Sequence, residues 1–144
     1  MFLQVLSLTN MITDLHLLVI HFPIALLSIA VLFDFLFYFI RRDDLIGASW
    51  WTMLFGVISC FAAVITGFVS DSLYEHLFTT WPFWDNHGMV QILSFLLFIV
   101  LFYVKTYHSK TIDRFQTAYL FVSALFVLIL FYGAHLGAVL SGRA

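Results

Sequence analysis

The feature that most constrains this chain is a set of four long stretches almost free of charged residues. They comprise residues 15–40, interrupted only by Asp34, and residues 45–70, 86–104 and 115–142. Each stretch reaches the ~18–20 residues that a helix rising ~1.5 Å per residue needs to cross ~30 Å of hydrocarbon. Backbone groups in lipid must bond within their own segment, and the stretches are too long for barrel strands. We therefore predict four transmembrane helices.

The composition supports a membrane protein of one domain. Of 144 residues, 63% are hydrophobic and 10% are charged, which a small soluble domain could not accommodate. A net charge of −2 without a basic tract excludes a nucleic-acid partner. The single cysteine, Cys60, excludes an internal disulfide, a Cys-x-x-Cys site and a covalently attached c-type haem. Residues 1–11 lack the basic start of a secretory signal peptide, and we expect them at the membrane interface.

The predicted helices cover approximately residues 14–40, 46–70, 82–106 and 114–141 of a single domain, 1–144. Short connections make successive helices antiparallel neighbours, so the expected fold is an all-α, up-down-up-down four-helix bundle. One side carries five basic residues: Arg41, Arg42, Lys105, Lys110 and Arg114. Arg143 alone lies on the other side. The positive-inside rule then places both termini outside, which in a bacterial inner membrane is the periplasmic face.

The histidines gather at the outer end of this topology. Five of the six are there, namely His16, His21, His76, His87 and His135, and only His108 lies on the inner side. If Pro82 occupies the first turn of the third helix, His87 is five residues inside it. His21, ~7.5 Å deeper than His16 at ~1.5 Å per residue, and His135 then share its depth. Buried polar groups at that depth need partners. We expect His16, His76 and His108 to be solvated.

Small and polar residues accompany these histidines. Gly133 and Gly137 flank His135 and allow close approach of another backbone or of a flat ring. The second helix carries a similar small-residue stripe, and the third a polar stripe of His87, Gln91 and Ser94. The small residues of the second helix are Gly56, Cys60, Ala63 and Gly67. Ordinary helix packing and interhelical hydrogen bonding explain each feature taken alone. Asp34 is expected to pair with a basic residue near the inner surface.

The first functional hypothesis is a b-type haem protein. Two histidines fill both axial positions of a haem and suit it to electron transfer. His21 and His135 are the preferred pair, and His87 is an alternative ligand or the partner of His16 in a second haem. Gly133 and Gly137 would make room for the macrocycle, and Arg143 would meet the propionates. Such a protein could pass electrons at the outer face between quinol and a periplasmic redox protein.

Two other hypotheses stay open. His21, His87 and His135 could hold a single zinc, copper or iron ion. Alternatively, the chain is a structural or assembly subunit of a larger membrane complex, or a homo-oligomer, in which histidines bond to neighbouring helices. No Ser-His-acid pattern, phosphate loop or carboxylate pair occurs, so an electron-transfer or accessory subunit is favoured over a stand-alone enzyme.

The segment His16-Leu-Leu-Val-Ile-His21-Phe-Pro23-Ile-Ala-Leu-Leu resembles the opening of a bacterial family of predicted four-helix membrane proteins, domain-of-unknown-function family 2231. Thr66-Gly67-Phe68, His87 and Gly133-Ala-His135-Leu-Gly137 are similar to its other landmarks, so the likeness covers nearly the whole chain. Leu17 stands where the family usually has Pro. Family members are sometimes joined to c-type cytochrome modules, which implies a link to electron transfer.

Overall fold

The computed structural model describes residues 2–74 and 82–140, and all of its regular structure there is helical. The helices in chain order are α1 (Phe2–Ile40), α2 (Asp44–Tyr74), η1 (Phe83–Asp85), α3 (His87–Tyr107), α4 (Ser109–Arg114) and α5 (Gln116–Leu140). Four of them, α1, α2, α3 and α5, are long and apolar enough to cross a membrane. The all-α prediction with four spanning helices is confirmed.

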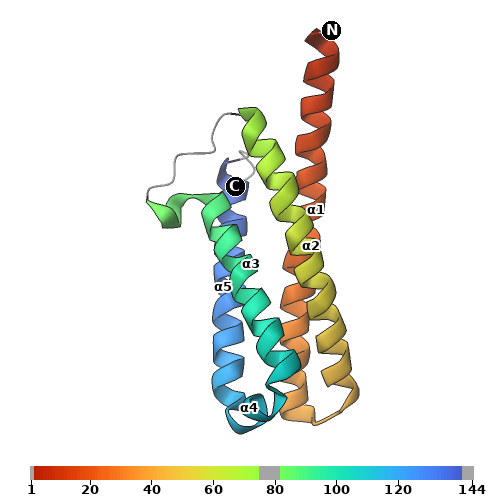
Figure 1. Ribbon diagram of the computed structural model, residues 1–144, viewed down its shortest axis with the longest axis vertical. Helices are drawn as coiled ribbons and strands as arrows, with labels where there is room; N and C mark the ends of the chain where they lie inside the picture. Colours follow the sequence, from red (N-terminus) through yellow and green to blue (C-terminus); the bar gives the residue numbers. More distant parts are fainter. Residues whose placement is uncertain (1, 75–81, 141–144) are drawn as a thin grey trace.

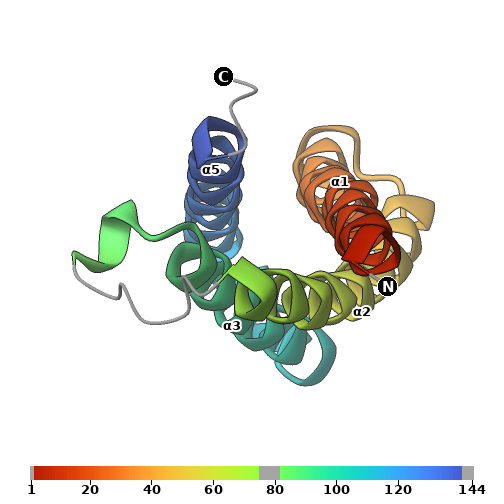
Figure 2. The same cartoon turned by 90° about the horizontal axis from the view of Figure 1, so that it is seen from above.

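The four long helices alternate in direction and follow one another around the bundle (Figure 1). α1 packs against α2, α2 against α3, α3 against α5, and α5 meets α1. Seen from above, they form an arc with α1 and α5 at its two ends (Figure 2). α1 begins and α5 ends at the same end of the bundle, here called the histidine end. The opposite end, which includes Arg41, Arg42 and α4, is called the basic end.

The helix starts differ from the prediction at two places. α1 begins at Phe2 rather than near residue 14, and its first turns extend past α2 (Figure 1). α3 begins at His87, so the prediction that Pro82 lies in its first turn is wrong. The physical reason is Asn86, a favoured N-cap residue, whose side-chain oxygen accepts the backbone N–H of Met89 at 3.0 Å. His87 therefore stands at the first position of α3, not five residues inside it.

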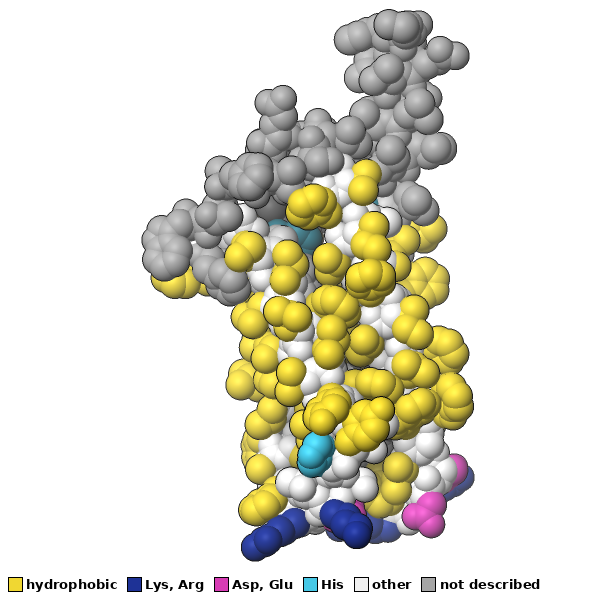
Figure 3. All heavy atoms as spheres, viewed as in Figure 1, with side chains coloured by type: hydrophobic (Ala, Val, Ile, Leu, Met, Phe, Trp, Pro, Cys, Tyr) yellow, Lys and Arg dark blue, Asp and Glu magenta, His cyan; other side chains and the backbone are white. Residues whose placement is uncertain are grey.

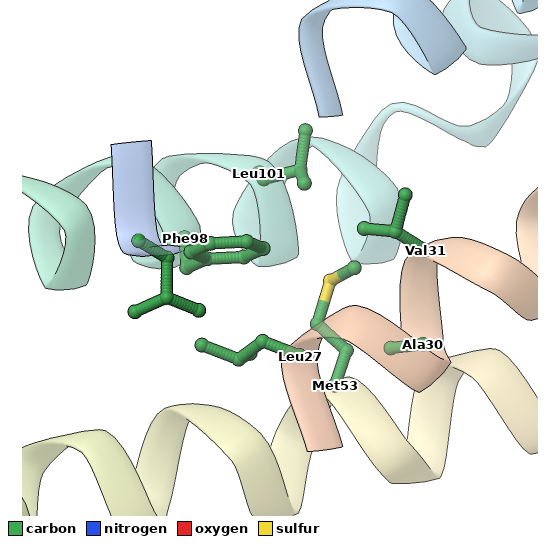
Figure 4. Packing of buried hydrophobic residues seen from close by; sticks show 7 residues of the cluster. Leu27, Ala30, Val31, Met53, Phe98 and Leu101 are labelled. Atoms are coloured by element: carbon green, nitrogen blue, oxygen red, sulfur yellow. The ribbon is translucent and has the colours of Figure 1, made fainter. Parts of the chain in front are cut away.

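The interior is small and the exterior is apolar, as expected for a bundle in lipid. The buried cluster joins all four long helices and consists of Leu27, Ala30, Val31, Met53, Phe98, Leu101 and Leu130, most of which Figure 4 labels. Large apolar side chains also cover the outside: Phe121 is 73% exposed and Leu128 63%. In Figure 3 they form a broad band above charged side chains gathered at the basic end. This surface requires a lipid bilayer around it.

Candidate functional site

His16 of α1 is held between α1 and α2. Its Nδ1 lies 3.0 Å from the hydroxyl oxygen of Thr66. That hydroxyl is 3.1 Å from the carbonyl oxygens of Ala62 and Ala63 and donates its proton there, so it accepts Nδ1–H from His16. The ring also lies against Gly67, where an added Cβ would come within 3.0 Å of Cε1. His16, expected in solvent, is instead half-buried between helices.

His87 of α3 is held against α5 in the same way. Its Nδ1–H donates to the carbonyl oxygen of Gly133 at 2.6 Å. A Cβ on Gly137 would lie only 2.6 Å from Cε1 of the His87 ring, so only glycine fits at that position without movement. Gly137 thus seats the imidazole of His87, and Gly133 accepts its hydrogen bond. A Cβ on Gly133 would instead meet Gln91 and Val90 at 3.0 Å.

The structure brings His16 and His87 together at the histidine end. The two rings are near enough to interact electrostatically, although they belong to α1 and α3. The contacts of His87 with Gly133 and Gly137 set its level against α5. The later start of α3 places His87 nearer the end of the bundle than predicted.

His21 and His135 lie on the outside of the two helices at the ends of the arc. Both side chains are exposed. The Nδ1–H of His21 donates to the carbonyl oxygen of Leu17, one turn earlier in α1, at 2.6 Å. Among the side chains that the structure describes, no three His, Cys, Asp or Glu residues are grouped so that they could hold a metal ion. His21, His87 and His135 thus do not form one three-ligand cluster. His76 and Arg143 lie outside the described residues, and His108 is exposed at the basic end.

A second polar site lies inside the bundle near the basic end. Asp34 is 8% exposed and forms an ion pair with Lys105, which confirms the predicted pairing. The other carboxylate oxygen accepts the hydroxyl of Tyr119 at 2.9 Å. Lys105 also donates to the hydroxyl of Ser49 at 2.7 Å, and Ser49 donates to the carbonyl oxygen of Ala30 at 2.7 Å. One network thus connects α1, α2, α3 and α5.

The sequence prediction missed three members of these sites: Thr66, Ser49 and Tyr119. Thr66 immediately precedes Gly67, a residue of the predicted small-residue stripe, and that adjacency was the available signal. Ser49, Tyr119 and Lys105 lie five, three and two residues from the ends of their helices, near the level of Asp34. The sequence therefore showed that these residues share a depth near the basic end. It did not show which helix faces they occupy.

Comparison with known proteins gives one match. The family described as "Predicted membrane protein (DUF2231)" matches residues 13–144. No curated protein and no solved structure matches the chain.

Proposed function

The chain belongs to the DUF2231 family of predicted membrane proteins, and from this premise we propose that it binds a b-type haem and takes part in electron transfer at the histidine end. The proposal includes an orientation. Five basic residues at the other end put that end in the cytoplasm of a bacterial cell and the histidine end in the periplasm. Quinol from the membrane and a periplasmic redox protein would be the partners.

The observation that carries the proposal is the hydrogen bonding of the imidazoles. In His16, His21 and His87, Nδ1–H is held by an oxygen of the protein, at 3.0, 2.6 and 2.6 Å respectively. The proton is thereby kept on Nδ1, and Nε2 retains the lone pair that binds iron. Histidines that ligate metals almost always have this arrangement, because the bond fixes the tautomer and the orientation of the ring. The donor set of this end therefore fits a haem.

His21 and His135 are the residues that would hold the haem. They come from α1 and α5, the two helices at the ends of the arc (Figure 2). Their exposure leaves each Nε2 accessible from outside the packed interior. His16 and His87 are the proposed second pair.

Gly133 and Gly137 take a different part in this proposal than the sequence suggested. They seat the imidazole of His87 and fix its tautomer, so the macrocycle would not lie on them. When bound through two imidazoles, the haem would supply reversible one-electron transfer. The chain would orient the ligands and surround them with apolar helices. Arg143 keeps its proposed role at the propionates.

The test is an optical spectrum of the purified protein in detergent, oxidised and then reduced with dithionite, with haem added during expression. We expect a sharp red-shifted Soret band with resolved α and β bands. His21→Ala and His135→Ala should each abolish the bis-imidazole spectrum, and the exposed His108→Ala at the basic end should leave it unchanged. Loss of only part of the haem in His87→Ala would indicate that His16 and His87 hold a second haem.

A colourless protein that also fails to take up added haem would overturn the proposal. Elemental analysis of the same sample would then distinguish the two remaining functions. A stoichiometric transition metal would support an ion site, and its absence a structural or assembly subunit of a larger complex. Retention of the full spectrum in both His21→Ala and His135→Ala would reject that ligand pair.

A further inference from the structure

A groove in the membrane-facing surface lies between α3 and α5, at the basic end and away from the histidines. It encloses about 260 Å³. Its walls are aliphatic and aromatic side chains of both helices, including Val100, Val104, Ala118 and Val122. Ile112 of α4 and Phe115, just after α4, line it at the basic end. The groove therefore offers hydrocarbon contacts along its length and reaches the end of the bundle where the helices leave the membrane. We call it the α3/α5 groove.

A cationic side chain stands beside this groove near the basic end. The guanidinium of Arg114 lies over the ring of Phe115, which lines the groove, 5.3 Å from the centroid. Lys110, on the same short helix and next to the lining residue Thr111, is exposed. The acidic residue of α4, Asp113, lines the neighbouring cavity that contains Asp34 and Lys105 instead of the groove. The short helix beside the groove thus carries two exposed basic side chains.

We propose that the α3/α5 groove binds one acyl chain of an anionic phospholipid, with the phosphate held by Arg114 and Lys110. The acyl chain would pack along the apolar walls of the groove. The guanidinium of Arg114 can bind two phosphate oxygens at once. The volume is below the roughly 300–1,000 Å³ of pockets that enclose whole drug-sized ligands, which suits a single hydrocarbon chain. Basic residues next to a membrane attract anionic headgroups by charge, so the site selects for net negative lipid.

The charge part is tested by native mass spectrometry of the protein in mild detergent, with added phosphatidylglycerol or phosphatidylcholine of identical chains. We expect a first phosphatidylglycerol to bind more tightly than phosphatidylcholine. Arg114→Gln and Lys110→Gln lie on an exposed helix and should leave folding intact. Each should weaken phosphatidylglycerol binding about fivefold and leave phosphatidylcholine unchanged. Equal affinity of the wild type for the two lipids would overturn the proposal.

The chain part is tested by filling the groove. Ala118→Phe places a ring among the walls and should abolish the first tight lipid. Ala62→Phe, at an exposed alanine of α2 that also faces lipid, is the matched control and should bind like the wild type. Unchanged binding in Ala118→Phe would reject the groove as the site. Lipid extraction from the purified protein adds a further check, because a co-purified isoprenoid quinone lost in Ala118→Phe would replace the phospholipid as occupant and overturn the proposal.

Discussion

The two ends of the bundle handle buried polar groups in different ways. At the basic end, Asp34 and Lys105 belong to one network with groups from all four long helices. At the histidine end, the hydrogen bonds join helices in pairs: His16 links α1 to α2, and His87 links α3 to α5. Among the side-chain hydrogen bonds described here, those at the basic end thus join all four long helices, and the two imidazole bonds at the histidine end each join one pair.

This difference indicates where the bundle can adapt to a ligand. Separating α1 from α3 at the basic end would leave two charges unpaired in a low-dielectric interior, which is strongly unfavourable. Separating α2 or α5 there would remove a hydroxyl partner of Lys105 or of Asp34. Separating the α1–α2 pair from the α3–α5 pair at the histidine end leaves both imidazole hydrogen bonds intact. The basic end therefore fixes the helix arrangement more strongly, and the proposed cofactor would enter between the pairs at the histidine end.

The strongest test of this comparison is Lys105→Met, which removes the cation and leaves Asp34 buried without it. We expect the free energy of unfolding to fall by ~3–5 kcal/mol, the usual effect of leaving one buried charge unpaired. Thermal unfolding in detergent, followed by size-exclusion chromatography, measures the loss. The control is Arg42→Ala. Arg42 forms an exposed ion pair with Asp44, and the hydrogen bond between them raises the pKa of Arg42. Because solvent screens this pair, we expect no measurable change in Tm.

A double variant separates the charge from the packing. In Asp34→Leu/Lys105→Met both charges are replaced by apolar side chains and neither is left unpaired, so most of the lost stability should return. If Lys105→Met unfolds no earlier than Arg42→Ala, the network does not fix the basic end, and the contrast between the ends fails.

A smaller effect is expected for Tyr119→Phe. The substitution removes the hydroxyl that donates to Asp34 at 2.9 Å and keeps the ring, which lies 5.8 Å from Nζ of Lys105. Hydrogen bonds to charged groups contribute ~1.5–3 kcal/mol, and we expect a loss in that range. Tyr132→Phe is the matched control, because its hydroxyl donates to a backbone oxygen at an exposed site. Equal losses in the two variants, measured by the same thermal assay, would show that the carboxylate does not depend on Tyr119.

The sequence predicted the fold well because long uncharged stretches permit few alternatives. Helix number and the pairing of Asp34 with a basic residue followed from charge placement, and antiparallel order followed from the short connections. The start of α3 did not follow, since Pro82 and Asn86 are both acceptable near a helix start and only the Asn86 cap decides between them. That choice placed His87 at the first position of α3.

The candidate site was predictable as a region, but its pairings were not. The composition of each stretch placed histidines at one end. Which faces they occupy depends on helix rotation, which sequence spacing does not define relative to a neighbour. Gly67 and Gly137 were identified as small residues for close packing, yet their partners, the rings of His16 and His87, follow only from the structure.

A glycine series sharpens the account of the histidine end and gives the smallest effects. In Gly137→Ala the new Cβ would lie 2.6 Å from the His87 ring, and in Gly67→Ala 3.0 Å from the His16 ring. Overpacking of this kind destabilises by ~1–3 kcal/mol, and we expect the low end for Gly137→Ala and less for Gly67→Ala. Gly47, also helical, has nothing within 4 Å of an added Cβ, so Gly47→Ala should stabilise by up to ~1 kcal/mol. If Gly137→Ala stabilised the protein as much as Gly47→Ala, the His87 ring would not lie against Gly137. The α3–α5 contact at the histidine end, and with it the division into two helix pairs, would then be rejected.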